Sequence, residues 1–155
     1  MIEAGDKAPD VTLQMTDESE AKLSSFKGKP LVLYFYPKDD TPGCTKEALQ
    51  FTELAKEFDK AGVKVIGVSK DPPAKHEKFI AKHDLAIDLA TDADGSVTEA
   101  FGVWVEKNMY GRKYMGIQRA TFLIDAKGKV VKVWPKVKVA GHAEDVLAEA
   151  KALDA

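Results

Sequence analysis

Strongly apolar segments that alternate with segments of helical periodicity constrain the fold of this chain more than any other feature. LVLYFY, residues 31–36, is apolar throughout, which is typical of a strand buried on both faces. Residues 63–69 (VKVIGVS) and 119–125 (RATFLID) also read as buried strands. Residues 130–135 (VVKVWP) follow the last of these across an AKGK turn, and the pair predicts a hairpin.

The longest segment between these strands has the spacing of an amphipathic helix. Within residues 44–62 one face carries a set of apolar side chains: Ala48, Phe51, Leu54, Ala55 and Phe58. Thr41 is expected at the N-cap and Pro42 at the first helical position, and Gly62 is expected to end the helix.

Two further helices are predicted, within residues 71–84 and 140–155, so the core order is β-α-β-α-β-β-α. In this order two right-handed crossovers feed parallel strands, and a hairpin completes the sheet. This is an α/β chain with the order of the thioredoxin fold, an N-terminal β-hairpin within residues 9–26 and an insert before the third core strand. The insert, residues 85–103, reads as a short strand, a turn and a short helix. The length fits a single domain, residues 1–155.

Charge and hydropathy argue against several classes of function. The formal net charge is −2 and the pI is about 5.9, so no attraction to nucleic acid or to an anionic membrane is expected. No apolar run approaches the roughly 18 residues that a membrane span needs. The segment MIEAGDKAPDVTL lacks the basic and apolar regions of a signal peptide. One cysteine makes no internal disulfide, so we expect a cytoplasmic location.

The single cysteine, Cys44, lies in the stretch DDTPGCTKEAL, between a predicted strand and a predicted helix. If Thr41 is the N-cap, Cys44 is the third helical residue, where backbone N–H groups have no acceptor inside the helix. These N–H groups and the helix dipole favour the thiolate, which is the nucleophilic form. The alternative is a small, inert, buried side chain. The polar and turn-forming neighbours of Cys44 favour the reactive thiol.

Three stretches of the sequence resemble a known family. YFYPKDDTPGCTKEA is similar to the peroxidatic motif of the peroxiredoxins, P-x-x-x-T/S-x-x-C, filled here by Pro37, Thr41 and Cys44. GIQRATFLID and VWPKVKVAGHAEDVL resemble the bacterioferritin comigratory protein branch, also called peroxiredoxin Q. The resemblance extends over nearly the whole chain, from APDVTL to the last predicted helix.

The resemblance implies a role for each matching residue. Cys44 would attack one oxygen of a hydroperoxide and become a sulfenic acid. Thr41 would hold and orient the peroxide, and Pro37 would shield the thiolate from water. The backbone N–H groups of Gly43 and Cys44 would donate to the peroxide oxygens. Arg119 would stabilise both the thiolate and the developing alkoxide.

Alternatives exist for three of these side chains. Arg119 precedes a buried strand, where an arginine needs an anionic partner, although a surface ion pair would also satisfy it. Thr41 is also a simple N-cap. Glu47 matches a family position and would orient Arg119, or it is a solvated acid that complements the helix dipole.

Peroxiredoxins of this branch often carry a second, resolving cysteine. The two positions at which the family places it are here Leu49 and a site near Ile80. The resemblance therefore implies a one-cysteine form that is recycled by an external thiol, either thioredoxin or glutathione with glutaredoxin. The branch includes many monomers, and we expect a monomer here.

These observations predict a thiol-dependent peroxidase that reduces hydrogen peroxide and organic hydroperoxides. The alternative is a redox-sensing or binding module, in which a partner protein reads the oxidation of Cys44. A disulfide oxidoreductase of the thioredoxin type is disfavoured because its C-x-x-C motif is here C-T-K-E.

No cofactor and no metal are expected. TDADGSVTEAF resembles a calcium loop, but Ala90 and Phe101 would fill its first and twelfth positions, which require acidic ligands. His76, His83 and His142 follow no metal-binding pattern and are expected to face solvent.

Overall fold

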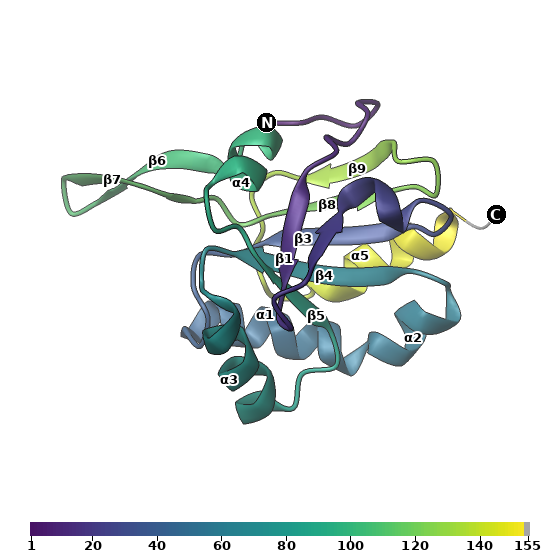
Figure 1. Ribbon diagram of the computed structural model, residues 1–155, viewed down its shortest axis with the longest axis horizontal. Helices are drawn as coiled ribbons and strands as arrows, with labels where there is room; N and C mark the ends of the chain where they lie inside the picture. Colours follow the sequence, from purple (N-terminus) through teal and green to yellow (C-terminus); the bar gives the residue numbers. More distant parts are fainter. Residues whose placement is uncertain (154–155) are drawn as a thin grey trace.

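Strands and helices alternate along most of the chain (Figure 1). The computed structural model describes residues 1–153. Its strands are β1 (Thr12–Met15), β2 (Glu20–Lys22), β3 (Leu31–Phe35), β4 (Lys64–Ser69), β5 (Asp88–Thr91), β6 (Trp104–Met109), β7 (Arg112–Ile117), β8 (Ala120–Ile124) and β9 (Val130–Trp134). Its helices are the 3-10 turn η1 (Leu23–Phe26), α1 (Pro42–Glu53), α2 (Ala55–Lys60), α3 (Pro73–His83), α4 (Ser96–Phe101) and α5 (His142–Ala152).

Seven strands form one mixed sheet in the order β2-β1-β5-β4-β3-β8-β9. β3, β4 and β5 are parallel to one another, whereas β8 is antiparallel to β3 and β9 is antiparallel to β8. The predicted α/β class, the β8–β9 hairpin and the N-terminal hairpin of β1 and β2 are confirmed. The predicted short strand and short helix of the insert are β5 and α4.

The second parallel crossover ends at a different strand from the one that the core order implied. It runs from β4 through α3 to β5, which is the short strand of the insert. The third strong core segment, β8, reaches the other side of β3 and pairs with it antiparallel, with Phe35 opposite Ala120. This register brings the residue before β8, Arg119, to the end of β3 at which the cysteine loop begins.

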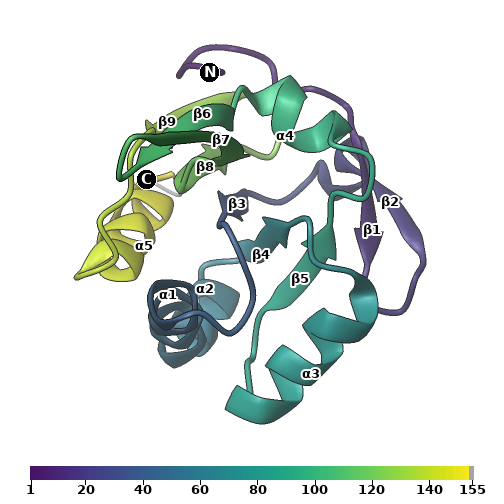
Figure 2. The same ribbon diagram turned by 90° about the vertical axis from the view of Figure 1, so that its left-hand side faces the viewer.

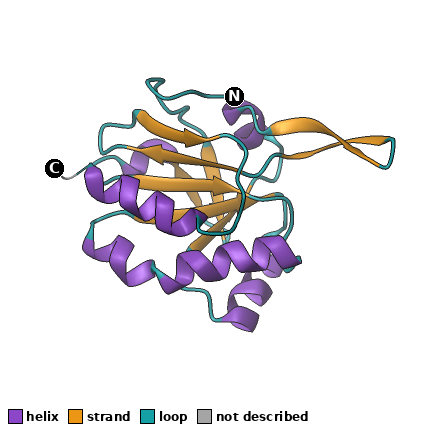
Figure 3. Ribbon diagram, turned by 180° about the vertical axis from the view of Figure 1, so that it is seen from behind, coloured by secondary structure: helices purple, strands orange, loops and turns teal. Residues whose placement is uncertain are grey.

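The sheet separates two apolar cores (Figure 2). Successive side chains of β3 point to opposite faces, because side chains alternate along a strand: Val32 and Tyr34 on one face, Leu31, Leu33 and Phe35 on the other. Helices α1, α2, α3 and α5 cover the face of Tyr34, as the view from behind also shows (Figure 3). Cys44 is part of that helix-covered core.

The predicted helix over residues 44–62 is wrong in one respect, because it bends at Leu54 and forms two helices. Leu54 has φ −97° and ψ 5°, which departs from α-helical values. Phe51 and Phe58, one on each side of the bend, are both buried, and their ring centroids lie 5.9 Å apart. The expected start of the helix, with Thr41 at the N-cap and Pro42 first, is confirmed.

A second small sheet, formed by β6 and β7, was not predicted from the sequence. These strands are antiparallel. Their pairing runs from Trp104 opposite Ile117 to Met109 opposite Arg112, and they project from the body of the molecule (Figure 1). Tyr110 and Gly111 connect them, with φ of 53° and 79°. Positive φ at both residues of a two-residue turn is the signature of a type I′ hairpin, and Gly111 was the available signal.

Candidate active site

Cys44 occupies the third position of α1 and is only 2% exposed. The six residues 36–41 carry the chain from the end of β3 into this helix. The first helical hydrogen bond is donated by the Thr45 N–H to the Thr41 carbonyl. Within residues 1–153 the preceding N–H groups, of Gly43 and Cys44, have no acceptor, so they remain free to donate to a molecule bound at the start of α1.

The Arg119 guanidinium joins two side chains of α1, Cys44 and Glu47. Its Nη2 donates to Cys44 Sγ at 3.3 Å, and its Nη1 donates to Glu47 Oε1 at 2.6 Å. A Cβ atom at Gly43 would lie 3.3 Å from the same Nη2, so a side chain there would press on the guanidinium. The structure therefore brings Cys44, Gly43, Glu47 and Arg119 into one site, although Arg119 lies 75 residues from Cys44 in sequence.

Glu47 is almost completely buried, with 1% of its surface exposed. The alternative of a solvated acid is therefore wrong. Burial raises the pKa of Glu47 to about 7, although Arg119 acts in the opposite direction. Burial also acts to lower the pKa of Arg119, but Glu47 and Cys44 outweigh it and the pKa of Arg119 is raised. Among the described residues, Glu47 Oε2 has no hydrogen-bond partner.

Thr41 and Pro37 belong to the loop before α1 and make no hydrogen bond to Cys44, Glu47 or Arg119 among the described residues. The Thr41 hydroxyl donates to the Lys38 carbonyl at 2.8 Å and makes no side-chain cap bond to α1. Its lone pairs are therefore still available to accept a hydrogen bond. Pro37 lies two residues after the end of β3, and it is exposed.

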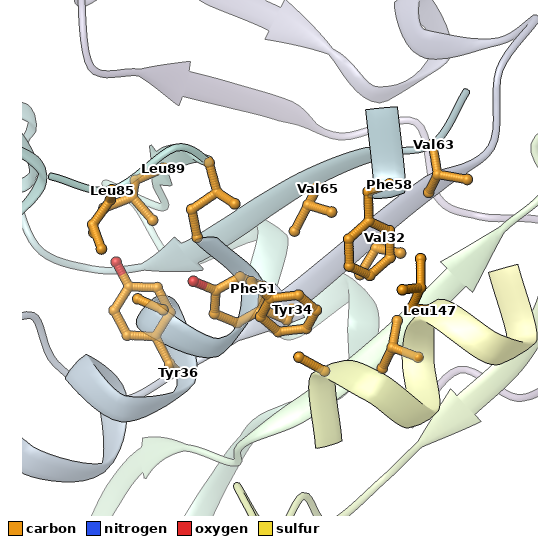
Figure 4. Packing of buried hydrophobic residues seen from close by; sticks show 14 of the residues in the cluster. Val32, Tyr34, Tyr36, Phe51, Phe58, Val63, Val65, Leu85, Leu89 and Leu147 are labelled. Atoms are coloured by element: carbon orange, nitrogen blue, oxygen red, sulfur yellow. The ribbon is translucent and has the colours of Figure 1, made fainter. Parts of the chain in front are cut away.

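Aromatic side chains belong to the same apolar cluster as Cys44, and Figure 4 shows Tyr34, Tyr36 and Phe51 within it. Tyr34 of β3 stacks on Phe51 of α1 with ring centroids 4.7 Å apart. Gly67 makes room for it, since a Cβ at that position would lie 2.6 Å from Tyr34 Cζ. Burial, followed by the charges of Glu47 and Cys44, raises the pKa of Tyr34 well above its usual value of 10. Within the described chain, the Tyr34 hydroxyl has no partner.

A second buried polar group lies in the loop that precedes Cys44, and sequence reasoning missed it. The Asp39 carboxylate, 2% exposed, accepts a hydrogen bond from the Tyr36 hydroxyl and lies 2.6 Å from His76 Nδ1. The expectation that the histidines face solvent is wrong for His76 and His142, which are both buried. His142 Nε2 contacts the Thr121 hydroxyl at 2.8 Å, and burial lowers the pKa of His142 to about 4.

Residues 1–153 contain neither a candidate metal centre nor a candidate membrane-spanning helix. No group of three or more His, Cys, Asp or Glu side chains is placed to hold a metal ion. In the same range, no helix has the length and apolar character needed to cross a bilayer.

Comparison with known proteins identifies the family. Residues 4–133 match the AhpC/TSA family. A putative peroxiredoxin Bcp of Coxiella burnetii is 53% identical over 147 residues, which cover 94% of this chain and 97% of that protein. Peroxiredoxin Bcp of Bacillus subtilis is 49% identical over 146 residues, which cover 94% and 93%.

The solved structures agree with the sequence comparison. The bacterioferritin comigratory protein of Xanthomonas campestris, studied for its alkyl peroxide reduction activity, superposes with a TM-score of 0.92 at 47% identity. The match covers 98% of this chain and 99% of that one. A PrxQ mutant of Xylella fastidiosa gives a TM-score of 0.94 at 38% identity, and the match covers 100% of this chain and 99% of that one. These matches confirm the thioredoxin-like fold, and the chain belongs to the AhpC/TSA family as a peroxiredoxin of the Bcp/PrxQ group with a single cysteine.

Proposed function

We propose that this peroxiredoxin reduces hydroperoxides at Cys44 and is recycled by an external thiol. The Cys44 thiolate attacks the terminal oxygen of the peroxide, the O–O bond breaks, and the alcohol or water leaves with a proton. The resulting sulfenic acid reacts with one thiol to give a mixed disulfide and water. A second thiol releases the reduced Cys44 and leaves as the disulfide of the reductant.

The observation that carries this proposal is the Arg119 guanidinium, which contacts Cys44 Sγ and Glu47 in a buried site at the start of α1. A guanidinium stabilises negative charge both on the thiolate and on the oxygen that leaves. Burial strengthens this effect, because water screens the charges less. Glu47 holds the second nitrogen of Arg119 and so orients the first toward the sulfur.

The remaining residues of the loop bind the peroxide. The Thr41 hydroxyl already donates to the Lys38 carbonyl, so in this arrangement it accepts a hydrogen bond from the O–H of the terminal peroxide oxygen and orients that oxygen toward the sulfur. The N–H groups of Gly43 and Cys44 donate to the peroxide oxygens. Pro37 limits the access of water to the thiolate from the end of β3.

The reductant comes from outside the chain because Cys44 is the only cysteine. Leu49 and Ile80, at the positions of a family resolving cysteine, are partly buried and pack against the helix-covered core. We propose thioredoxin, or glutathione with glutaredoxin, as the reductant, and a cytoplasmic monomer that works as one domain over residues 1–155. Organic hydroperoxides are proposed substrates beside hydrogen peroxide, as the X. campestris relative studied for alkyl peroxide reduction suggests.

Peroxide consumption by the Cys44→Ser variant tests this proposal. Parent and variant are mixed with hydrogen peroxide or cumene hydroperoxide, and with dithiothreitol, thioredoxin or glutathione with glutaredoxin in separate reactions. The parent is expected to consume many equivalents of peroxide and the variant none. A variant as active as the parent would remove Cys44 from the mechanism. A parent that is oxidised once and turns over with none of the reductants would favour the redox-sensing module.

A further inference from the structure

The loop that carries the chain to Cys44 is tied to α3 by a buried side-chain network that the proposed chemistry does not use. His76 of α3 is fully buried. Its Nε2 lies 3.0 Å from the Ala90 carbonyl, an acceptor only, so Nε2 bears a proton. Its Nδ1 lies 2.6 Å from Asp39 Oδ2, and this contact holds a proton between the ring and the carboxylate. The other Asp39 oxygen accepts from the Tyr36 hydroxyl.

Further bonds tie the same loop to the same region. The Asp39 N–H donates to Asp71 Oδ2 at 2.8 Å, just before α3. The Asp40 carboxylate contacts Lys82 Nζ at 2.7 Å and His83 Nε2 at 2.9 Å, both on α3. The backbone of Asp40 has φ 59°, in the left-handed region, which residues other than glycine adopt at a cost in free energy. The loop therefore stays in a strained conformation that its contacts with α3 maintain.

Recycling by an external thiol requires this loop to move. Cys44 is 2% exposed, which lets a small peroxide approach but leaves no room for the sulfur of a tripeptide or a protein. Formation of the mixed disulfide therefore needs the first turn of α1 to open. Residues 39 and 40 lie just before this turn, so an opening that extends to them must break the contacts of Asp39 and Asp40 with α3.

We infer that Asp39 and His76 are positioning residues that hold the Cys44 loop closed and thereby set the fate of the sulfenic acid. In the closed state the sulfenic acid stays at the peroxide site, where a second peroxide oxidises it to sulfinic acid and releases an alcohol or water. In the open state a thiol reduces it. This inference rests on the proposed function, and it makes the Asp39–His76 contact a control on the balance between recycling and over-oxidation.

Two substitutions of His76 separate its two contacts. In His76→Asn the amide nitrogen takes the place of Nδ1 and keeps the bond to Asp39. In His76→Gln the amide nitrogen takes the place of Nε2. This variant keeps the bond to the Ala90 carbonyl and loses the bond to Asp39. Tyr36→Phe removes the bond from the Tyr36 hydroxyl to Asp39 and its 3.4 Å contact with His76 Nδ1, and is the milder variant if His76→Gln folds poorly. Val130→Ala, buried in the other core, controls for a general loss of stability.

The experiment measures sulfinic acid formed per turnover by intact mass, with hydrogen peroxide and dithiothreitol at fixed concentrations. His76→Gln is expected to form roughly tenfold less sulfinic acid per turnover than the parent, which corresponds to the loss of one charge-assisted hydrogen bond. Tyr36→Phe should also form less sulfinic acid per turnover than the parent, but the decrease should be smaller than in His76→Gln. His76→Asn and Val130→Ala should behave as the parent. Equal values for His76→Gln and the parent, or an equal shift in Val130→Ala, would overturn the inference.

Amide hydrogen exchange of the reduced chain gives a second reading that needs no peroxide. Exchange of residues 39–46 is expected to accelerate in His76→Gln and to stay near the parent rate in His76→Asn. Unchanged exchange in His76→Gln would refute the role of the contact even if the peroxidase proposal stands. Accelerated exchange in a chain that consumes no peroxide would instead support the contact and refute the peroxidase.

Discussion

Two buried carboxylates lie on either side of Thr41, and they are satisfied to different degrees. Asp39 uses both of its oxygens, one for the Tyr36 hydroxyl and one for His76. Glu47 uses one oxygen for Arg119, and its second oxygen has no partner among residues 1–153. Each acid is at most 2% exposed, so the contrast lies in the partners and not in the depth of burial.

This difference separates a structural group from a reactive one. A buried polar group with all its hydrogen bonds made fixes one conformation, whereas a half-satisfied group is costly and is found where function requires it. The half-satisfied acid is the one that shares a guanidinium with the thiol. The satisfied acid holds the loop that leads to the thiol.

Arg119→Ala should produce the largest effect, because it removes the cation from both the thiol and Glu47. The rate constant of Cys44 oxidation by hydrogen peroxide is expected to fall about 10²–10³-fold, the usual loss for one donor to a developing oxyanion. Stopped-flow fluorescence measures this rate. Arg119→Lys keeps the positive charge but not both donors, so its rate constant should lie between those of the parent and Arg119→Ala. An Arg119→Ala rate within threefold of the parent would leave the guanidinium without a catalytic role.

Glu47→Gln should change the pH dependence of stability. A carboxyl whose pKa rises from 4.5 to about 7 on folding stabilises the fold at low pH, and this contribution is lost as the pH rises toward 7. The free energy of unfolding of the parent, relative to Glu47→Gln, should therefore fall between pH 4.5 and 7.5, by up to roughly 3 kcal/mol. Urea denaturation at several pH values gives both curves. Parallel curves would mean that Glu47 ionises normally.

Removal of the hydroxyl should change the free energy of unfolding in opposite directions at two neighbouring tyrosines, Tyr34 in β3 and Tyr36 just after it. Tyr34→Phe removes a buried hydroxyl without a partner and should raise the free energy of unfolding by about 1 kcal/mol. Tyr36→Phe removes a hydroxyl that donates to Asp39 and should lower it by about 1–2 kcal/mol. Urea denaturation at one pH measures both changes. Changes of the same sign would show that hydrogen-bond satisfaction does not distinguish the two sites.

The strongest sequence signals were local ones, and they predicted the elements that carry the site. The apolar run of β3, the N-cap at Thr41 and the single thiol at Cys44 can each be read from a few neighbouring residues. Arg119 was found through its place at the start of a buried strand and through the family motif. The bend at Leu54 was missed because helical periodicity continues through it on both sides.

The long-range polar contacts outside the family motif were beyond sequence reasoning. Asp39 and His76 are 37 residues apart, and neither has a spacing that indicates its partner. His76 has charged neighbours on α3, so its pattern is that of a solvated side chain. Only the packing of α3 against β5 places its ring beside Asp39 and the Ala90 carbonyl. The burial of Glu47 depends in the same way on Arg119, which arrives from β8.

Intact mass after one equivalent of hydrogen peroxide, quenched within seconds and then treated with dithiothreitol, is the measurement to make first. The parent should gain one oxygen at Cys44 and lose it again on addition of the thiol, while Arg119→Ala should gain it far more slowly. A parent that stays unoxidised over that time would mean that the contact between Arg119 and Cys44 does not activate the sulfur, and would contradict the peroxidase mechanism.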